Sequence, residues 1–416
     1  MTLKPPFKQH KTAQHTSEVS PTFCVLPFMH LATNASGKYR VCCNSTPGKN
    51  HITNEKGEPM KLDQHDIEEV WNLPYYQNIR KQLINGERPG ICQRCFSEED
   101  AGVRSARQGY NESWYNESID IQTQYNHPDI RYVDLRLGNL CNLKCRMCNP
   151  YASSMWVKEW NDVVKTAELV PNDTLPQEEL DRLSKMDWFE NDKVWENISK
   201  IADCIEEIYL TGGEPTLALK QYDLFQYLQD KDFAKHIKLK YNTNLTNIPE
   251  RMVWYWHFFK LVKINASIDA VGVLDRYVRY PSAWPKIEEN FKKLRRLRNT
   301  RLQIHSTIQT YNILDLPKLY DWCDSIMFED VYLNILNHPK CLNIRTLPTK
   351  IKKLVEERLQ PYMNRPKVKQ MINYMNKEDW YDTHWKEFVD YTNALDKSRN
   401  ENILDLVPEF GEFWNV

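Results

Sequence analysis

The sequence predicts an α/β fold in which strands and helices alternate through the middle of the chain. Six β-prone segments end in glycine or polar turns, and stretches with helical spacing of apolar residues separate them. The segments span residues 132–137, 208–211, 237–242, 261–269, 302–309 and 331–336. Strands that alternate with helices in this way form parallel sheets. We therefore expect a six-stranded parallel sheet over about residues 131–340.

The chain has 416 residues, which is longer than one ordinary domain. We expect smaller parts on both sides of the α/β core. The predicted division is a flexible lead-in over 1–21, a small β-hairpin and helix module over 22–107, a linker over 108–130, the core over 131–340 and a helical C-terminal region over 341–416.

Charge and hydropathy limit the partners that we expect. The chain has 55 Lys and Arg against 56 Asp and Glu, so its net charge gives no bulk attraction to nucleic acid or to an anionic membrane. The start lacks the apolar region of a signal peptide, and no run of about 18 apolar residues occurs. We expect a soluble, cytoplasmic protein that binds neither a membrane nor nucleic acid. Eleven cysteines in such a protein indicate metal or redox chemistry, because the cytosol keeps thiols reduced.

Three cysteines directly follow the first predicted strand of the core. Cys141, Cys145 and Cys148 are separated by three and then two residues, and Gly138 forms the turn before them. Three thiolates can hold three irons of a 4Fe-4S cube, which leaves the fourth iron open to a substrate or cofactor. A zinc knuckle is the alternative interpretation of this spacing.

This CxxxCxxC loop resembles the signature of the radical S-adenosylmethionine (SAM) superfamily, which follows the first strand of a partial (β/α)6 barrel of the TIM type. The resemblance implies that Cys141, Cys145 and Cys148 bind the catalytic 4Fe-4S cluster and that SAM binds at its open iron. It also implies reductive cleavage of SAM, a 5′-deoxyadenosyl radical that abstracts hydrogen from a substrate, and a reductant such as flavodoxin or ferredoxin. The family usually has an aromatic residue where this chain has Met147. The polarizable Met147 sulfur can still contact an adenine face.

A glycine turn after the second strand resembles the second signature of the same family, GGEP, in which backbone groups bind the methionyl ammonium of SAM. Glycine is expected there because a Cβ atom would keep the main chain from approaching the ligand. An ordinary turn between strand and helix is the alternative. The predicted cofactor-binding residues of this turn are Gly212, Gly213, Glu214 and Pro215.

Later strand ends supply the other predicted cofactor contacts, because active sites of such barrels lie at the carboxyl ends of the strands. Asn244 and Ile308 follow or end the third and fifth strands, and Ser267 and Asp269 alternate at the end of the fourth. Arg279 resembles an arginine that follows the fourth strand in related enzymes. A salt bridge at the barrel rim is the alternative role for it.

The N-terminal module contains four more cysteines in two pairs. Cys24 and Cys42 flank the hairpin signal at residues 34–37, and Cys92 and Cys95 form a CxxC pair. Together they are a full ligand set for a closed site. The pattern resembles the twitch module, a one-cluster relative of the SPASM domain, and this implies an auxiliary 4Fe-4S cluster. In the family the module follows the barrel, whereas here it precedes it.

Two alternatives concern this second site. A structural zinc ion is the alternative to the auxiliary cluster. Cys43 is adjacent to Cys42 and could replace it as a ligand. We favour Cys42, because alternation along a strand points Cys43 to the opposite face.

These patterns together predict a radical SAM enzyme of oxidoreductase type. An auxiliary cluster with four protein ligands cannot easily bind substrate, so we expect it to transfer electrons during net oxidation of a peptide or protein. The alternatives are a redox-neutral radical SAM enzyme with a zinc-stabilised N-terminal module, and a non-enzymatic iron-sulfur redox sensor. The GGEP turn and the polar strand ends disfavour the sensor, which needs no SAM site.

Overall fold

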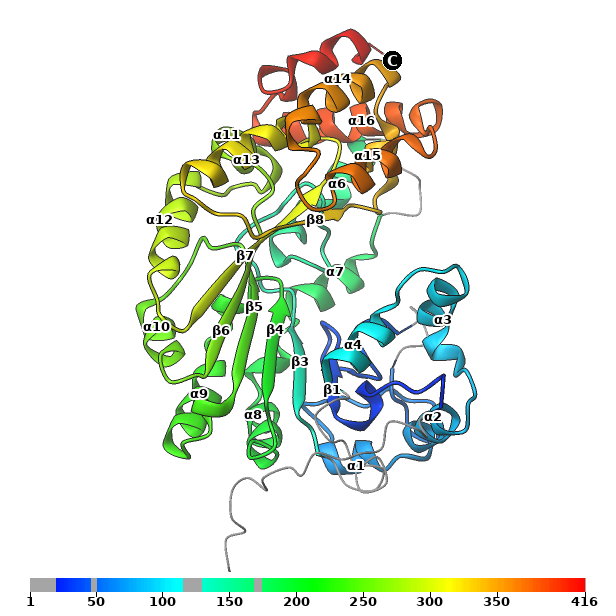
Figure 1. Ribbon diagram of the computed structural model, residues 1–416, viewed down its shortest axis with the longest axis vertical. Helices are drawn as coiled ribbons and strands as arrows, with labels where there is room; N and C mark the ends of the chain where they lie inside the picture. Colours follow the sequence, from blue (N-terminus) through cyan, green and yellow to red (C-terminus); the bar gives the residue numbers. More distant parts are fainter. Residues whose placement is uncertain (1–19, 46–50, 115–128, 168–173, 416) are drawn as a thin grey trace, which may run out of the picture.

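A computed structural model describes residues 20–45, 51–114, 129–167 and 174–415 of the chain. Figure 1 shows a curved sheet with helices along its outer side, an N-terminal segment beside one edge and helices of the C-terminal region above it.

The sheet has eight strands in the order β2-β1-β3-β4-β5-β6-β7-β8. The six strands from β3 to β8 are parallel to their neighbours and confirm the predicted α/β fold with a partial barrel. They are β3 (Tyr132–Leu137), β4 (Glu207–Gly212), β5 (Lys238–Thr243), β6 (Leu261–Ala266), β7 (Thr300–Ile308) and β8 (Val331–Ile335).

The predicted N-terminal hairpin is part of the same sheet. Its strands β1 (His30–Thr33) and β2 (Tyr39–Arg40) are antiparallel, and β1 pairs in parallel with β3, with His30 opposite Tyr132. The turn between them requires Gly37, whose φ is +74° and whose added Cβ would lie 2.6 Å from the Trp188 ring. The hairpin therefore extends the barrel sheet at its β3 edge, a pairing that the sequence did not predict.

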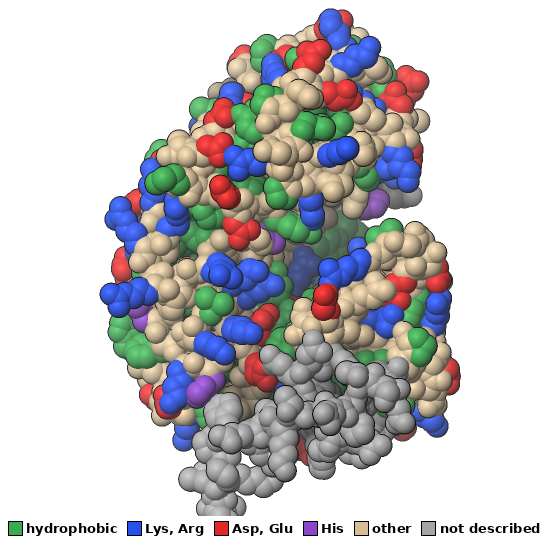
Figure 2. All heavy atoms as spheres, in the orientation of Figure 1, with side chains coloured by type: hydrophobic (Ala, Val, Ile, Leu, Met, Phe, Trp, Pro, Cys, Tyr) green, Lys and Arg blue, Asp and Glu red, His purple; other side chains and the backbone are tan. Residues whose placement is uncertain are grey.

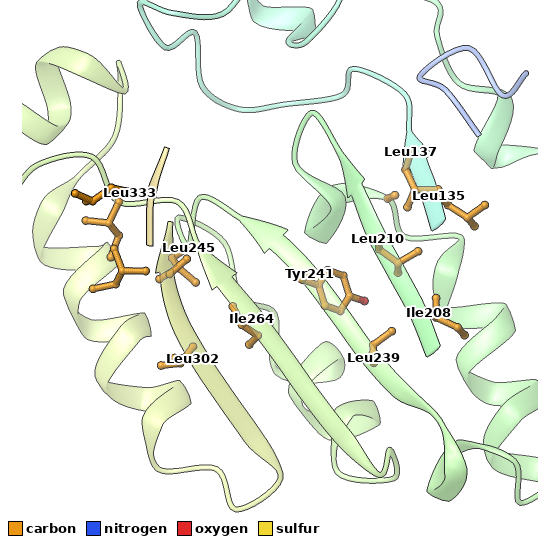
Figure 3. Close-up of a cluster of buried hydrophobic side chains, with 14 of the residues drawn as sticks. Leu135, Leu137, Ile208, Leu210, Leu239, Tyr241, Leu245, Ile264, Leu302 and Leu333 are labelled. Atoms are coloured by element: carbon orange, nitrogen blue, oxygen red, sulfur yellow. The ribbon is translucent and has the colours of Figure 1, made fainter. Parts of the chain in front are cut away.

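The outer face of the barrel sheet forms the main core. Leu239 and Tyr241 of β5 are fully buried, whereas the alternating Lys238, Lys240 and Asn242 are half-buried on the inner face. Figure 3 shows the cluster of apolar side chains that the strands direct towards the helices. The helices between the strands are α6 (Trp160–Thr166), α7 (Gln177–Ser184), α8 (Asp192–Lys200), α9 (Gln221–Asp230), α10 (Glu250–Trp256), α11 (Gly272–Val278), α12 (Trp284–Arg295) and α13 (Leu316–Ser325).

Both ends of the chain are mainly helical. The N-terminal segment contributes α1 (Ile67–Trp71), α2 (Pro74–Ile84), α3 (Gln93–Asp100) and α4 (Ala106–Trp114), and the C-terminal region contributes α14 (Thr349–Leu359), α15 (Val368–Asn376) and α16 (Tyr381–Arg399). Among the described helices, none has the length and apolar character needed to cross a membrane.

Candidate functional site

The three thiols of the first cysteine loop lie together at the carboxyl end of β3. The Cys145 and Cys148 side chains form a hydrogen bond with each other, and this bond lowers the pKa of Cys145 and raises that of Cys148. Burial raises the pKa of Cys141 to about 12, and the neighbouring Cys145 adds to the shift. The Leu143 amide donates to the Cys141 Sγ atom at 3.4 Å. The fold thus brings together the three residues predicted to bind one cluster.

A buried cation stands beside these thiols. The Arg279 Nη1 atom lies 3.9 Å from Cys145 Sγ, and its Nε donates to the Asp269 carboxylate at 2.8 Å. The other Asp269 oxygen accepts a hydrogen bond from the Thr307 amide at 2.7 Å. Both oxygens of Asp269 are therefore engaged by protein groups, and this carboxylate positions Arg279. A positive charge at this place stabilises the thiolate forms that iron binding requires.

The two glycines of the β4 turn pack against the backbone of the cysteine loop. An added Cβ at Gly213 would lie 2.3 Å from the Leu140 carbonyl oxygen, and one at Gly212, whose φ is +142°, would lie 2.6 Å from the Leu137 oxygen. From the sequence, these glycines were expected to allow close approach of a ligand. The structure gives a further reason, because the loop that carries the thiols already occupies the space of a side chain.

Glu214 joins three parts of the site while almost fully buried. Its backbone amide donates to the Leu140 carbonyl oxygen at 2.7 Å. Its carboxylate accepts from the Asn244 backbone amide at 2.7 Å and from the Thr216 hydroxyl at 2.8 Å. Burial raises the pKa of Glu214. The adjacent Pro215 is buried at the start of a 3-10 turn (Pro215–Leu217). Glu214 therefore braces the ends of β4 and β5 against the cysteine loop.

The remaining predicted residues lie at strand ends around this network. The Asn244 side-chain amide donates to Asn142 of the cysteine loop at 3.0 Å. Ser267 is half-buried after β6, Met147 is half-buried within the loop, and Ile308 is fully buried as the last residue of β7. The structure thus places all of them near the carboxyl ends of the strands. The Ser267 backbone amide donates to the Thr243 oxygen at 2.8 Å, and Ile308 packs in the apolar core.

Sequence reasoning missed Arg146, which lies inside the cysteine loop. Its side chain is fully buried and donates to Asp396 at 2.6 Å, to Glu401 at 2.9 Å and to the Tyr277 carbonyl at 2.9 Å. The guanidinium also lies 3.5 Å from the centre of the Tyr277 ring. Arg146 therefore clamps the loop to the end of α16 and to α11. No local pattern reveals this role, because the acidic partners are about 250 residues away in sequence.

The four cysteines predicted for the second site also approach one another. Cys24 interacts electrostatically with Cys92 and Cys95, and Cys42 interacts with Cys24 and Cys95. Burial is the largest cause of the raised pKa values of Cys24, Cys42 and Cys92, and it raises that of Cys92 to about 12. The Asn44 side-chain amide donates to Cys95 Sγ at 3.2 Å. Cys24 and Cys95 are buried and Cys42 and Cys92 are half-buried, so these thiols form a second set in the N-terminal segment.

Cys43 lies in a different environment from this set. Its Sγ is 3.7 Å from the Tyr110 hydroxyl, and its other charged neighbours are Asp134 and Arg40. This agrees with the alternation from which Cys42 was preferred as the ligand, and the choice between them stays a prediction.

Within the described residues, no three His, Cys, Asp or Glu side chains are grouped as ligands of one metal ion. The identity and mutual proximity of the thiols are the observations on which the cluster assignments rest. Thiolates are the usual ligands of iron-sulfur clusters, so the donor chemistry of both sets fits such groups.

Comparisons with known proteins give one family match. Residues 135–323 match the model of the radical SAM superfamily. A search of curated proteins found no match. Solved structures with a similar arrangement include anSMEcpe with bound AdoMet, at 18% identity and a TM-score of 0.35 over 58% of this chain and 60% of that one. They also include Streptococcus suis SuiB bound to S-adenosylmethionine, at 14% identity and a TM-score of 0.34 over 75% of this chain and 65% of that one. This chain thus spans less than two thirds of either structure.

Proposed function

We propose that this radical SAM superfamily enzyme, which matches the family over residues 135–323, oxidises a peptide or protein substrate with the help of a second iron-sulfur cluster. The observation that carries the proposal is the pair of thiol sets. One set of three lies at the carboxyl end of β3, and one set of four lies in the N-terminal segment.

The first set would hold the 4Fe-4S cluster through Cys141, Cys145 and Cys148. With SAM bound, this cluster supplies the 5′-deoxyadenosyl radical that removes a hydrogen atom from the substrate. The glycine turn at 212–213 and Ser267 lie at strand ends where they could contact SAM. We propose that SAM is also contacted by Met147, Asn244, Asp269, Arg279 and Ile308.

The protein keeps this site in one geometry through buried contacts. Glu214 and the two glycines fix the β4 turn against the cysteine loop, and Arg146 fixes the loop against α16. Arg279 places a positive charge beside Cys145 and is itself oriented by Asp269. Such preorganisation lets a site stabilise charge without reorganising during the reaction.

The second set, Cys24, Cys42, Cys92 and Cys95, would hold an auxiliary 4Fe-4S cluster in a twitch-like module. Net oxidation by two electrons requires the substrate to lose a hydrogen atom and then an electron and a proton. A cluster with four protein ligands supplies an acceptor for that electron. A zinc ion would supply no such acceptor, since zinc has no redox chemistry.

A peptide or protein substrate agrees with the shape of the molecule. Figure 2 shows a hollow between the barrel and the N-terminal segment that opens to the surface on the viewed side.

The test is cluster reconstitution without air, followed by iron counting and measurement of 5′-deoxyadenosine formed from SAM with dithionite. We expect about eight irons per chain and SAM cleavage. Replacing Cys92 and Cys95 by Ser should lower the count to about four. Zinc in place of iron at this site would contradict the oxidative role.

A matched pair of variants tests the ligand choice. Cys42→Ser should lower the iron count as the Cys92 and Cys95 replacements do, whereas Cys43→Ser should leave it unchanged, because Cys43 lies against Tyr110 and Asp134. The opposite result would assign Cys43 as the ligand.

A further inference from the structure

The inner face of the barrel sheet carries basic side chains on neighbouring strands. Lys240 of β5 lies opposite Lys263 of β6 in the sheet register, and both are half-buried on the face away from the helices. Arg136 occupies the same face of β3, because it alternates with the buried Leu135 and Leu137. Figure 2 shows Lys and Arg side chains gathered in the hollow that this face lines.

These cations and two others form one electrostatic group, which we call the basic floor. His305 of β7 interacts with Lys240, Lys263 and Lys367, and Arg136 interacts with Arg40 of β2. Burial and these cations lower the pKa of His305 to about 4, so the imidazole is neutral. The basic floor consists of Arg40, Arg136, Lys240, Lys263 and Lys367.

The basic floor lacks the close carboxylate partners that Arg146 and Arg279 have. Arg146 and Arg279 each form a close ion pair. In the described part of the chain, no member of the basic floor lies within 4.0 Å of a carboxylate oxygen. Lys240 instead lies 4.4 Å from the centre of the Tyr209 ring, and Lys367 lies 3.5 Å from that of Tyr332.

Three carboxylates lie near the same face without neutralising it. Asp134, Glu207 and Asp330 interact with charged groups of this face. These three carboxylates are fewer than the five cations of the basic floor. Burial raises the pKa of Asp134 to about 7, so this carboxyl is partly protonated at neutral pH. Burial also lowers the pKa values of Lys240 and Arg136. A partly desolvated excess of positive charge favours an anion that can enter the face.

The basic floor also connects the two cysteine sets. Arg136 interacts with Cys148 of the first loop, and Arg40 donates to the carbonyl oxygen of Cys43 at 3.0 Å, directly after Cys42. Arg136 and Arg40 thus link the basic floor to the two cysteine loops.

We propose that the basic floor binds an acidic segment of the substrate, whose Asp or Glu carboxylates pair with Lys240, Lys263 and Arg136. This inference rests on the proposed function and adds the chemical class of its peptide substrate. Acidic peptide is favoured over nucleic acid for two reasons. The net charge of the chain is −1, and the outer surface in Figure 2 mixes positive and negative side chains, whereas a polyphosphate backbone requires a continuous basic stripe.

The test measures binding of a fluorescent hexaglutamate peptide to the cluster-loaded enzyme by anisotropy, with hexaglutamine as the neutral comparison. We expect the glutamate peptide to bind more tightly and its affinity to fall as salt is added. The double variant Lys240→Gln and Lys263→Gln should weaken binding at least about tenfold.

The matched control removes two positive charges from a solvent-exposed helix face. Lys292 and Lys293 of α12 pair with Glu288 and Glu250, and replacing both by Gln should leave peptide binding unchanged. If the Lys240 and Lys263 double variant does not fold, Lys263→Arg should keep the affinity and Lys263→Gln should lower it.

Several outcomes would overturn the proposal. These are equal binding of hexaglutamine, wild-type affinity of the double variant, and tight binding of inorganic phosphate or a short single-stranded DNA in place of the glutamate peptide. SAM cleavage by the unaltered enzyme is measured separately. Cleavage without glutamate binding would reject this inference alone, whereas glutamate binding without cleavage would reject the proposed function.

Discussion

The clamp on the cysteine loop gives a prediction whose size follows from the structure. Arg146→Met removes the guanidinium that pairs with Asp396 and Glu401 while keeping most of the side-chain volume. Removing one partner of a buried ion pair usually costs about 3 to 5 kcal/mol, because the other charge stays buried without compensation.

Two features set the expected value within that range. Asp396 keeps hydrogen bonds from the Tyr277 hydroxyl and the Ile403 amide, and the Asp396 and Glu401 side chains are 10% and 14% exposed. Both features reduce the cost. The lost cation-π contact with Tyr277 adds about 1 kcal/mol. We expect a loss of about 3 to 4 kcal/mol in the free energy of unfolding.

The assay is urea unfolding of the reduced, cluster-free protein, which isolates the fold from iron binding. The control is Arg182→Met, which breaks an exposed pair with Glu179 on α7 and should cost less than about 1 kcal/mol. The double variant Arg146→Met and Asp396→Asn should cost less than the sum of the single variants. A cost for Arg146→Met no larger than that of the control would refute the clamp.

Three further variants test other parts of the site. Gly213→Ala should destabilise the protein and release iron from the first loop, since its Cβ would meet the Leu140 oxygen at 2.3 Å. The control, Gly109→Ala in α4, meets no atom within 4 Å and should be neutral or stabilising in the same unfolding and iron assays. Arg279→Met should lower the reduction potential of the cluster at the first cysteine loop by on the order of 100 mV, because a nearby positive charge favours the added electron. Redox titration measures this potential, and an unchanged value would remove the electrostatic role of Arg279. Burial raises the pKa of Asp134 to about 7, so the stability that this carboxyl contributes is present below its unfolded pKa near 4 and is lost as pH rises through 7. Between these pH values the urea midpoint should fall less steeply for Asp134→Asn than for the unaltered protein, and an equal slope would contradict the raised pKa.

The parts of the fold that the sequence predicted depend on local signals. Each core strand has a run of apolar residues at period two or a buried apolar stretch, and each ends in a glycine or polar turn, as β5 does with Leu239 and Tyr241. The first cysteine loop was found because its ligands lie within eight residues of one another.

The features that the sequence did not predict depend on contacts between distant segments. Strand β1 has four residues and pairs with β3 about 100 residues later, so no local pattern specifies its partner. Arg146 has no sequence feature that sets it apart from other loop residues, and its role depends on Asp396 of α16, to which it donates a hydrogen bond. Lys238, Lys240 and Asn242 alternate along β5 and so share one face, but only the sheet register brings Lys240 beside Lys263.

Strand pairing explains how a cysteine set that precedes the barrel in sequence can serve it in space. The start of β3 is paired with β1 at His30 and contacts Tyr110, which lies beside Cys43. Its other end leads into the loop of Cys141, Cys145 and Cys148. The six residues of β3 span ~17 Å, and Asp134 and Arg136 lie on the inner face between these ends. A substrate held on that face would therefore lie between the proposed radical site and the proposed electron acceptor, whichever of them comes first along the chain.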